Sequence, residues 1–142
     1  MFLGQYRHSL DDKGRLTIPA KFRDELSNGA HLTQGFDRNL RLVTKAAFDE
    51  MATKVSQMQT TDPLTRILRR LIFASASEAD LDSVGRILIP QFLRDVAGLQ
   101  TDAVIVGVGE AIEIWLPDAW DEQLRLLSDV DANSQRFAAL EL

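Results

Sequence analysis

The sequence predicts an α+β protein in which two copies of one small unit share a single hydrophobic core. The chain has 142 residues, which is the size of one ordinary domain. A ten-residue segment occurs twice, and each occurrence is followed by the same succession of short strand-like stretches and Gly or Pro turn signals. One unit of about 45 residues with four short strands buries too little apolar surface to be stable alone. The two copies are therefore expected to form one pseudo-two-fold barrel or one interleaved sheet.

The repeated segment is the strongest of these observations. Leu10–Pro19 reads LDDKGRLTIP and Leu81–Pro90 reads LDSVGRILIP, so that six of ten positions are identical. After a slip of one residue the match resumes, and AFDE at 47–50 corresponds to AWDE at 119–122. Motifs that recur in the same order indicate an internal duplication.

Each copy is expected to begin with a strand, a tight turn and a second strand. The first strand is predicted at Gln5–Leu10 and at Glu78–Leu81. The turn contains Gly14 in one copy and Gly85 in the other, because glycine enters positive φ without a Cβ penalty. In the second strand the two-residue period directs one set of side chains to the core, namely Leu16 and Ile18 in the first copy and Ile87 and Ile89 in the second.

A short helix and a hairpin are expected next in each copy. Pro19 and Pro90 predict helix starts, because the first helical turn does not use the missing N–H. Asn28–Gly29 and Gly98 are expected to end these helices. The predicted hairpins pair His31–Phe36 with Leu40–Val43, and Ala103–Val108 with Ile112–Leu116.

Three further helix starts are marked by capping residues. Thr44 is a predicted N-cap, Pro117 is a first-turn proline, and Asp62–Pro63 combines both signals. The helix after Asp62 has an apolar stripe that either packs on the protein's own core or joins neighbouring subunits. The stripe consists of Leu64, Ile67, Leu68, Leu71 and Ile72, and the opposite face has Arg66, Arg69 and Arg70.

The chain is accordingly divided into four parts. These are a first repeat (5–50), a linker helix region (51–75), a second repeat (76–122) and a C-terminal helical tail (123–142). The end of the tail, from residue 133, is expected to be a last short helix or a frayed terminus.

The composition excludes several classes of chemistry. There are no cysteines and only two histidines, so disulfides, thiolate metal sites and cysteine nucleophiles are absent, and neither a metal nor a cofactor is expected. The carboxylates form no recognisable catalytic constellation with histidine and a nucleophile, so we expect no enzyme. Val104–Gly109 superficially resembles the start of a dinucleotide-binding motif, but the third glycine is missing and a hairpin explains it. No apolar stretch is long enough for a signal peptide or a membrane span, which predicts a cytoplasmic protein without a membrane partner.

Charge is distributed unevenly along the chain. The net charge is −5, but residues 1–71 have twelve basic and eight acidic side chains, whereas residues 72–142 have four basic and thirteen acidic ones. Such asymmetry between halves indicates that the basic half faces a polyanion.

The first turn provides the candidate nucleic-acid contacts. Arg15 could bind a guanine edge bidentately or clamp a phosphate, and Lys13 at the tip of the turn suits a phosphate. The alternative is that Arg15 only pairs with Asp11 across the turn, an interaction worth about 0–1 kcal/mol at a surface. The remaining candidates are Arg86, for which an inter-copy salt bridge is an alternative to DNA contact, Arg7 and Lys21 as weaker flanking contacts, Asp11 and Asp82 as orienting carboxylates, and Gly14 and Gly85 as turn residues.

The chain resembles the MraZ family of bacterial transcriptional regulators. The resemblance covers essentially the whole chain and rests on Met1–Pro19, read with Lys21–Arg23, and on the second Asp-x-x-Gly-Arg at Asp82–Arg86. The family's DNA-facing signature, Asp-x-Lys-Gly-Arg, falls on Asp11–Arg15. In the second copy the lysine position is Val84, which weakens the case for direct DNA contact by that copy.

This resemblance implies properties that the residue pattern alone does not. The fold would be a pseudo-two-fold swapped-hairpin β-barrel of two tandem SpoVT/AbrB-like repeats, and the chains would assemble into a ring. The ring would bind double-stranded DNA at direct repeats upstream of the division and cell-wall gene cluster, which includes its own gene, and repress it at the nucleoid. The alternative hypothesis is an oligomeric, antitoxin-like protein-interaction module.

Overall fold

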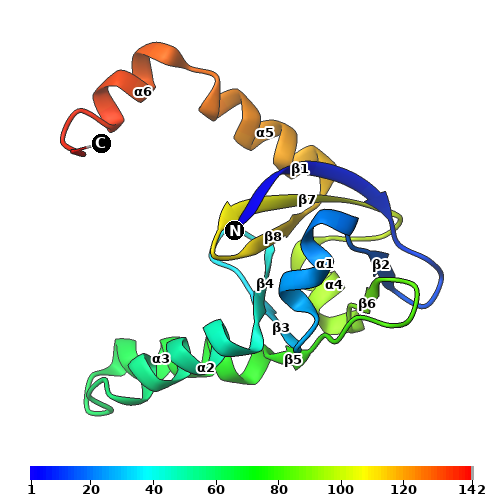
Figure 1. Cartoon of the computed structure of the whole chain (residues 1–142). Coiled ribbons are helices and arrows are strands. Elements are labelled where there is room, and N and C mark those ends of the chain that lie inside the picture. Colours follow the sequence, from blue (N-terminus) through cyan, green and yellow to red (C-terminus); the bar gives the residue numbers. More distant parts are fainter. Residues whose placement is uncertain (142) are drawn as a thin grey trace.

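The computed structural model describes residues 1–141 and shows an α+β fold built on antiparallel sheets (Figure 1). Six strands form one sheet in the order β1-β7-β8-β4-β3-β5, and β2 and β6 form a separate two-stranded sheet. The strands are β1 (Phe2–Ser9), β2 (Arg15–Thr17), β3 (Ala30–Gln34), β4 (Leu40–Thr44), β5 (Ser77–Glu78), β6 (Arg86–Leu88), β7 (Asp102–Gly109) and β8 (Ile112–Trp115). The helices are α1 (Ala20–Leu26), α2 (Lys45–Ser56), α3 (Pro63–Ser75), α4 (Gln91–Ala97), α5 (Pro117–Leu127) and α6 (Val130–Arg136).

The two halves of the chain are interleaved in both sheets. β1 pairs with β7 along its whole length, β4 pairs with β8, and β2 pairs with β6, where Leu16 lies opposite Ile87. The expectation of an interleaved sheet is therefore confirmed. The sheet formed within residues 1–141 is open, with β1 and β5 at its edges, and these residues do not close a barrel.

The hydrophobic core is shared by the two copies. Leu16 and Ile18 from the first copy and Ile87 and Ile89 from the second are completely buried in one cluster, as the two-residue period predicts. Alternate residues of β7 face opposite sides of the sheet. On the face of the sheet away from the main core, a smaller cluster contains Val104, Val106 and Trp115. Trp120 of α5 packs on these residues and belongs to the same cluster.

Local sequence signals determine where the helices begin and end. The Thr44 hydroxyl accepts a hydrogen bond from the Ala47 amide at 3.1 Å, and the Asp62 carboxylate accepts one from the Leu64 amide at 2.9 Å. Gly98 ends α4 in the left-handed conformation, at φ 68°. These predicted caps are confirmed because each depends on residues within one turn of the helix end.

The first strand of each copy differs from the prediction. β1 begins at Phe2 rather than Gln5, because Phe2 is fully buried and pairs opposite Gly109 of the other copy. In the second copy the strand predicted at Glu78–Leu81 is only Ser77–Glu78. This short edge strand β5 pairs with β3 at two positions, after which the chain turns away, so Leu81 lies outside the strand.

Two helical arms extend from the core. α2 and α3 form one arm, and α5 and α6 form the other; both leave the core on the side away from the turns next to β2 and β6 (Figure 1). Ile72 at the inner end of α3 is buried, whereas Leu64 and Ile67 at its outer end are 73% and 59% exposed. The protein's own core therefore covers only part of the apolar stripe. No helix among residues 1–141 combines the length and the hydropathy needed to span a membrane.

Each turn is supported by the other copy. The Gly14 carbonyl accepts a hydrogen bond from the Ile89 amide at 2.9 Å, and the Gly85 carbonyl accepts the matching bond from Ile18. The guanidinium of Arg94, held by the Ile89 carbonyl at 3.0 Å, packs against Gly14, which has φ +81°. A side chain at Gly14 would therefore meet both an unfavourable backbone conformation and an occupied space.

We predict that Gly14→Ala destabilises the protein more than Gly109→Ala does. Both glycines have positive φ, which costs a residue with a Cβ about 1–2 kcal/mol. At Gly109 the added Cβ meets nothing within 4 Å, whereas at Gly14 it would lie 2.7 Å from the Arg94 guanidinium and 2.9 Å from the Ile89 carbonyl oxygen. The overlap adds about 1–3 kcal/mol. Urea denaturation measures the difference, and equal losses in the two variants would contradict the packing of Arg94 on the turn.

Candidate nucleic-acid interface

The two turns of the duplication lie side by side at one end of the molecule. Residues 11–15 lead into β2 and residues 82–86 lead into β6, and the pairing of these strands places Arg15 opposite Leu88 and Thr17 opposite Arg86. This end lies opposite the two helical arms (Figure 1). The fold thus presents both copies of the Asp-x-x-Gly-Arg motif on one surface.

A carboxylate organises the first turn. One oxygen of Asp11 accepts hydrogen bonds from the backbone amides of Lys13 at 3.0 Å and Arg15 at 2.9 Å. Its other oxygen accepts a hydrogen bond from the Arg15 Nε at 2.6 Å. The pairing of Asp11 with Arg15 that the sequence offered as an alternative is therefore present, and it fixes the start of the arginine side chain.

The second turn repeats this geometry. Asp82 accepts hydrogen bonds from the amides of Val84 and Arg86, both at 2.9 Å, and from the Arg86 Nε at 2.8 Å. The residues that form the turn are therefore the aspartate, the glycine and the arginine, whichever side chain occupies the tip.

Both aspartates remain ionised well below neutral pH. The backbone hydrogen bond from Arg15, helped by the Arg15 side chain, holds the pKa of Asp11 below its ordinary value of 3.8, against an opposing effect of burial. The backbone hydrogen bond from Arg86 is the main cause of the lowered pKa of Asp82. Because the folded pKa values are the lower ones, the turns gain stability above about 3.8 that is lost as the pH falls below it.

An ion pair connects the two turns. A terminal nitrogen of Arg86 lies 3.7 Å from the same Asp11 oxygen that binds Arg15. The inter-copy salt bridge considered for Arg86 is thus present. The side chains of Arg15 and Arg86 are 35% and 28% exposed, so neither is enclosed in the core.

The tips of the two turns differ chemically. Lys13 is exposed at the tip of the first turn, and the equivalent Val84 is 60% exposed. Within residues 1–141 the terminal guanidinium nitrogens of Arg15 donate no hydrogen bond, so they remain available to a ligand. The first turn therefore presents an ammonium group and an oriented guanidinium, whereas the second presents an apolar side chain beside its arginine.

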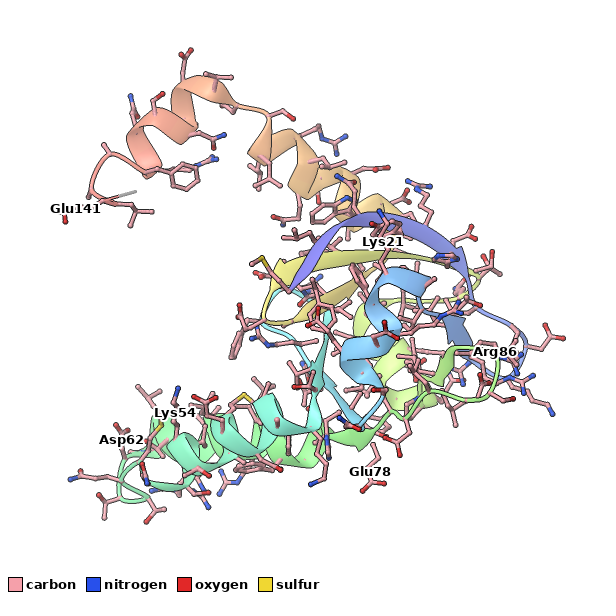
Figure 2. The ribbon with its side chains drawn as sticks, viewed as in Figure 1. Lys21, Lys54, Asp62, Glu78, Arg86 and Glu141 are labelled. Atoms are coloured by element: carbon pink, nitrogen blue, oxygen red, sulfur yellow. The ribbon has the colours of Figure 1, made fainter. Side chains whose placement is uncertain are left out.

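The flanking candidates lie away from the turns. Arg7 on β1 is 3.5 Å from Asp121 of α5, and Lys21 is exposed on α1, apart from Arg86 (Figure 2).

Arg23 and Arg94 were not among the predicted site residues, although the guanidinium of Arg23 packs against Gly85 as that of Arg94 packs against Gly14. The available signal was that an arginine followed by an aspartate occurs at the same place in both copies, as Arg23–Asp24 and Arg94–Asp95.

Metal binding has no support in this region. Among residues 1–141 no three side chains of His, Cys, Asp or Glu are grouped so that they could hold a metal ion.

Comparison with known proteins identifies close relatives. A family model described as "MraZ protein, putative antitoxin-like" matches residues 1–71 and again residues 72–140. A protein of Roseiflexus castenholzii named Transcriptional regulator MraZ is 48% identical over 138 residues, which cover 97% of this chain and 94% of that protein.

More distant relatives have the same name. The Thermomicrobium roseum protein is 44% identical over 99% of both chains, and the Dictyoglomus turgidum protein is 44% identical over 86% of this chain and 84% of its own. The family model matches once for each copy of the duplication, and the relatives match nearly from end to end. This chain belongs to the MraZ family.

Proposed function

We propose that the protein is a DNA-binding transcriptional repressor whose first turn enters the major groove. The observation that supports this most is the arrangement of the turn, in which the Asp11 carboxylate orients Arg15 while Lys13 remains exposed beside it. The relatives' name, transcriptional regulator, supports the same class of function. The protein acts by binding, in the cytoplasm and at the nucleoid, and not by catalysis.

Net charge alone does not explain the attraction to DNA. The first turn has two aspartates, Asp11 and Asp12, against Lys13 and Arg15, so its formal charge is zero. The three hydrogen bonds to Asp11 engage both oxygens of its carboxylate, which weakens its effect on an approaching phosphate. The strongly acidic arm formed by α5 and α6 lies at the other end of the molecule (Figure 1). A polyanion therefore meets less repulsion at the turns than at the α5–α6 arm.

The two arginines are assigned different roles. Because the Nε of Arg15 is bound to Asp11, its two terminal nitrogens can donate together to O6 and N7 of a guanine. Arg86 contacts both Asp82 and Asp11, is less exposed and lacks a neighbouring lysine. We assign Arg86 mainly to holding the two turns together. Arg7 and Lys21 are at most flanking phosphate contacts.

Assembly provides the affinity that one pair of turns lacks. A few phosphate contacts give only weak binding, typically 10⁻⁴–10⁻⁶ M when non-specific. In a ring of several chains, turns on one face would bind successive direct repeats about 10 bp apart and raise avidity roughly 10²–10⁴-fold. The resemblance to the family supports the finer proposal that these repeats lie upstream of the division and cell-wall genes, including the protein's own gene. It also supports assigning the interleaved copies to the swapped-hairpin SpoVT/AbrB type.

The alternative is an oligomeric, antitoxin-like module that binds proteins. The family description includes the word antitoxin, so this possibility has a specific basis. DNA binding requires the exposed cations of the first turn, Lys13 and Arg15, whereas binding of a protein partner does not depend on both of them.

We predict that Arg15→Ala lowers the affinity for DNA fragments selected by the protein from a random pool, and relaxes their sequence preference. Loss of a guanine contact costs about 1–3 kcal/mol at each engaged turn, that is, roughly 5- to 150-fold in affinity. The matched control is Arg86→Ala, which breaks the equivalent ion pair and is expected to weaken binding less. Gel-shift titration measures both, with unfolding curves to compare stability. Unchanged affinity and specificity in Arg15→Ala would favour the protein-binding alternative.

We predict that Lys13→Ala and Val84→Lys change the salt dependence of DNA binding in opposite directions. Each phosphate contact contributes about −0.9 to the slope of log K against log salt. Lys13→Ala should flatten this slope by that amount for each engaged turn, and Val84→Lys should steepen it. Lys54→Ala is the control, because Lys54 lies on α2 far from the turns (Figure 2). If all three variants have the wild-type slope, the tips of the turns do not contact phosphate.

A further inference from the structure

The second turn and the strand that follows it have two exposed apolar side chains. Val84 at the tip is 60% exposed, and Leu88 on β6 is 53% exposed. Ile87 and Ile89, the neighbours of Leu88 on each side, are completely buried, so Leu88 lies on the face of the β2–β6 sheet away from the core. Within residues 1–141, neither exposed side chain belongs to a hydrophobic cluster. The fold therefore does not use these two side chains for its own packing.

The first copy has polar residues at the same two positions. The residue 71 positions before Val84 is Lys13, at the tip of the first turn. The residue 71 positions before Leu88 is Thr17, on β2. The Val84 amide donates a hydrogen bond to Asp82 at 2.9 Å, so the second tip has the shape of the first without its cation. The two copies thus differ in chemistry, because one has an ammonium and a hydroxyl group where the other has only methyl groups.

Leu88 lies beside the arginine of the first turn. The pairing of β2 with β6 places Leu88 opposite Arg15, and the next pair, Leu16 with Ile87, is completely buried. Because side chains alternate along a strand, Arg15 and Leu88 face out from the core. Opposite residues of antiparallel strands have Cβ atoms about 4.5–5.5 Å apart. Successive bases of one DNA strand are about 3.4 Å apart along the helix axis, so the base next to the one that Arg15 contacts lies within reach of Leu88.

Methyl groups suit one feature of the base edges in a major groove. Val84 and Leu88 have no donor or acceptor atom in their side chains, so they can neither hydrogen-bond a base nor bind a phosphate. Thymine presents a C5-methyl group in the major groove, and apolar side chains distinguish it by packing on that group. We propose that Val84 and Leu88 contact the C5-methyl groups of thymines next to the guanine assigned to Arg15. The inference rests on the DNA binding proposed above and adds a second base to the sequence that the turns read.

Contacts of this kind give the binding site a direction. Two identical turns related by a two-fold axis would read the same bases on both sides and favour a palindromic site. A cationic first turn and an apolar second turn read different bases, so one chain recognises a sequence that differs from its own reverse complement. Such sequences are repeated head to tail in direct repeats, which agrees with the type of DNA site proposed above.

Replacement of thymine by uracil tests the contact, because uracil pairs with adenine in the same way but lacks the C5-methyl group. The DNA is a fragment that the protein selects from a random pool, with deoxyuridine placed at one thymine position at a time. We expect the wild type to lose affinity at the thymines next to the contacted guanine, by about fourfold for each methyl group removed from a contact. Gel-shift titration measures the ratio of the dissociation constants for the uracil and thymine fragments.

A double variant, Val84→Ser with Leu88→Ser, connects this ratio with the two side chains. Both positions are exposed, so the stability of the protein should be nearly unchanged. The variant should bind the uracil and thymine fragments equally. Phe92→Ser is the matched control, because Phe92 is 49% exposed on α4 and its counterpart in the first copy, Lys21, lies away from the turns (Figure 2). This control should keep the wild-type ratio.

Four results would overturn the inference. The first is a set of selected fragments without a fixed thymine beside the guanine, and the second is a wild-type ratio of about one at every thymine. The third is a double variant that keeps the wild-type ratio, which would leave Val84 and Leu88 as a surface for a protein partner. The fourth is an equal loss of the ratio in Phe92→Ser. In each case Arg15→Ala still reports on the guanine contact, so DNA binding can hold while this inference fails. If the wild type selects no DNA, both proposals fail together.

Discussion

The antiparallel pairing of β2 with β6 is the interaction on which the rest of the structure depends. It places Leu16 opposite Ile87 in the centre of the core and sets the two turns side by side. The hydrogen bonds from Ile18 to Gly85 and from Ile89 to Gly14 continue this pairing into the turns. Because each bond joins one copy to the other, the turns keep their geometry only when both copies are folded together. The surface proposed to bind DNA is therefore a product of the shared core and not of either copy alone.

The parts of the fold that could be predicted from sequence are those fixed by neighbouring residues. The N-caps at Thr44 and Asp62 and the left-handed end at Gly98 depend on a few adjacent positions, and the structure confirms them. The extent of β1 could not be predicted, because Phe2 is buried by a strand that lies about a hundred residues later in the chain. The pairing of β2 with β6 is also non-local. The turn before β2 predicts that a strand follows it, but not which distant strand pairs with that strand.

The candidate site also has local features that could be predicted from sequence and contacts between the two copies that could not. The spacing of Asp11, Gly14 and Arg15 was sufficient to indicate a structured turn with an orienting carboxylate, and the hydrogen bonds have that form. The support of Gly14 by Arg94 was not predictable, because the arginine comes from the first helix of the other copy. The salt bridge from Arg86 to Asp11 could be offered only as an alternative, since it depends on the distance between two turns that are 71 positions apart in sequence.

The duplication within one chain also separates the residues that form a turn from those that would use it. Asp82, Gly85 and Arg86 reproduce the hydrogen bonds of the first turn although Val84 replaces the lysine at its tip. The lysine is therefore unnecessary for the shape of the turn, and its presence in only one copy requires another explanation. A pair of identical chains could not differ in this way, whereas two fused copies can change independently. One copy can then keep a cationic tip while the other retains the same turn as a support and contributes the acidic C-terminal half of the chain. On this argument the lysine at the tip of only one turn follows from a division of roles between two turns of common shape.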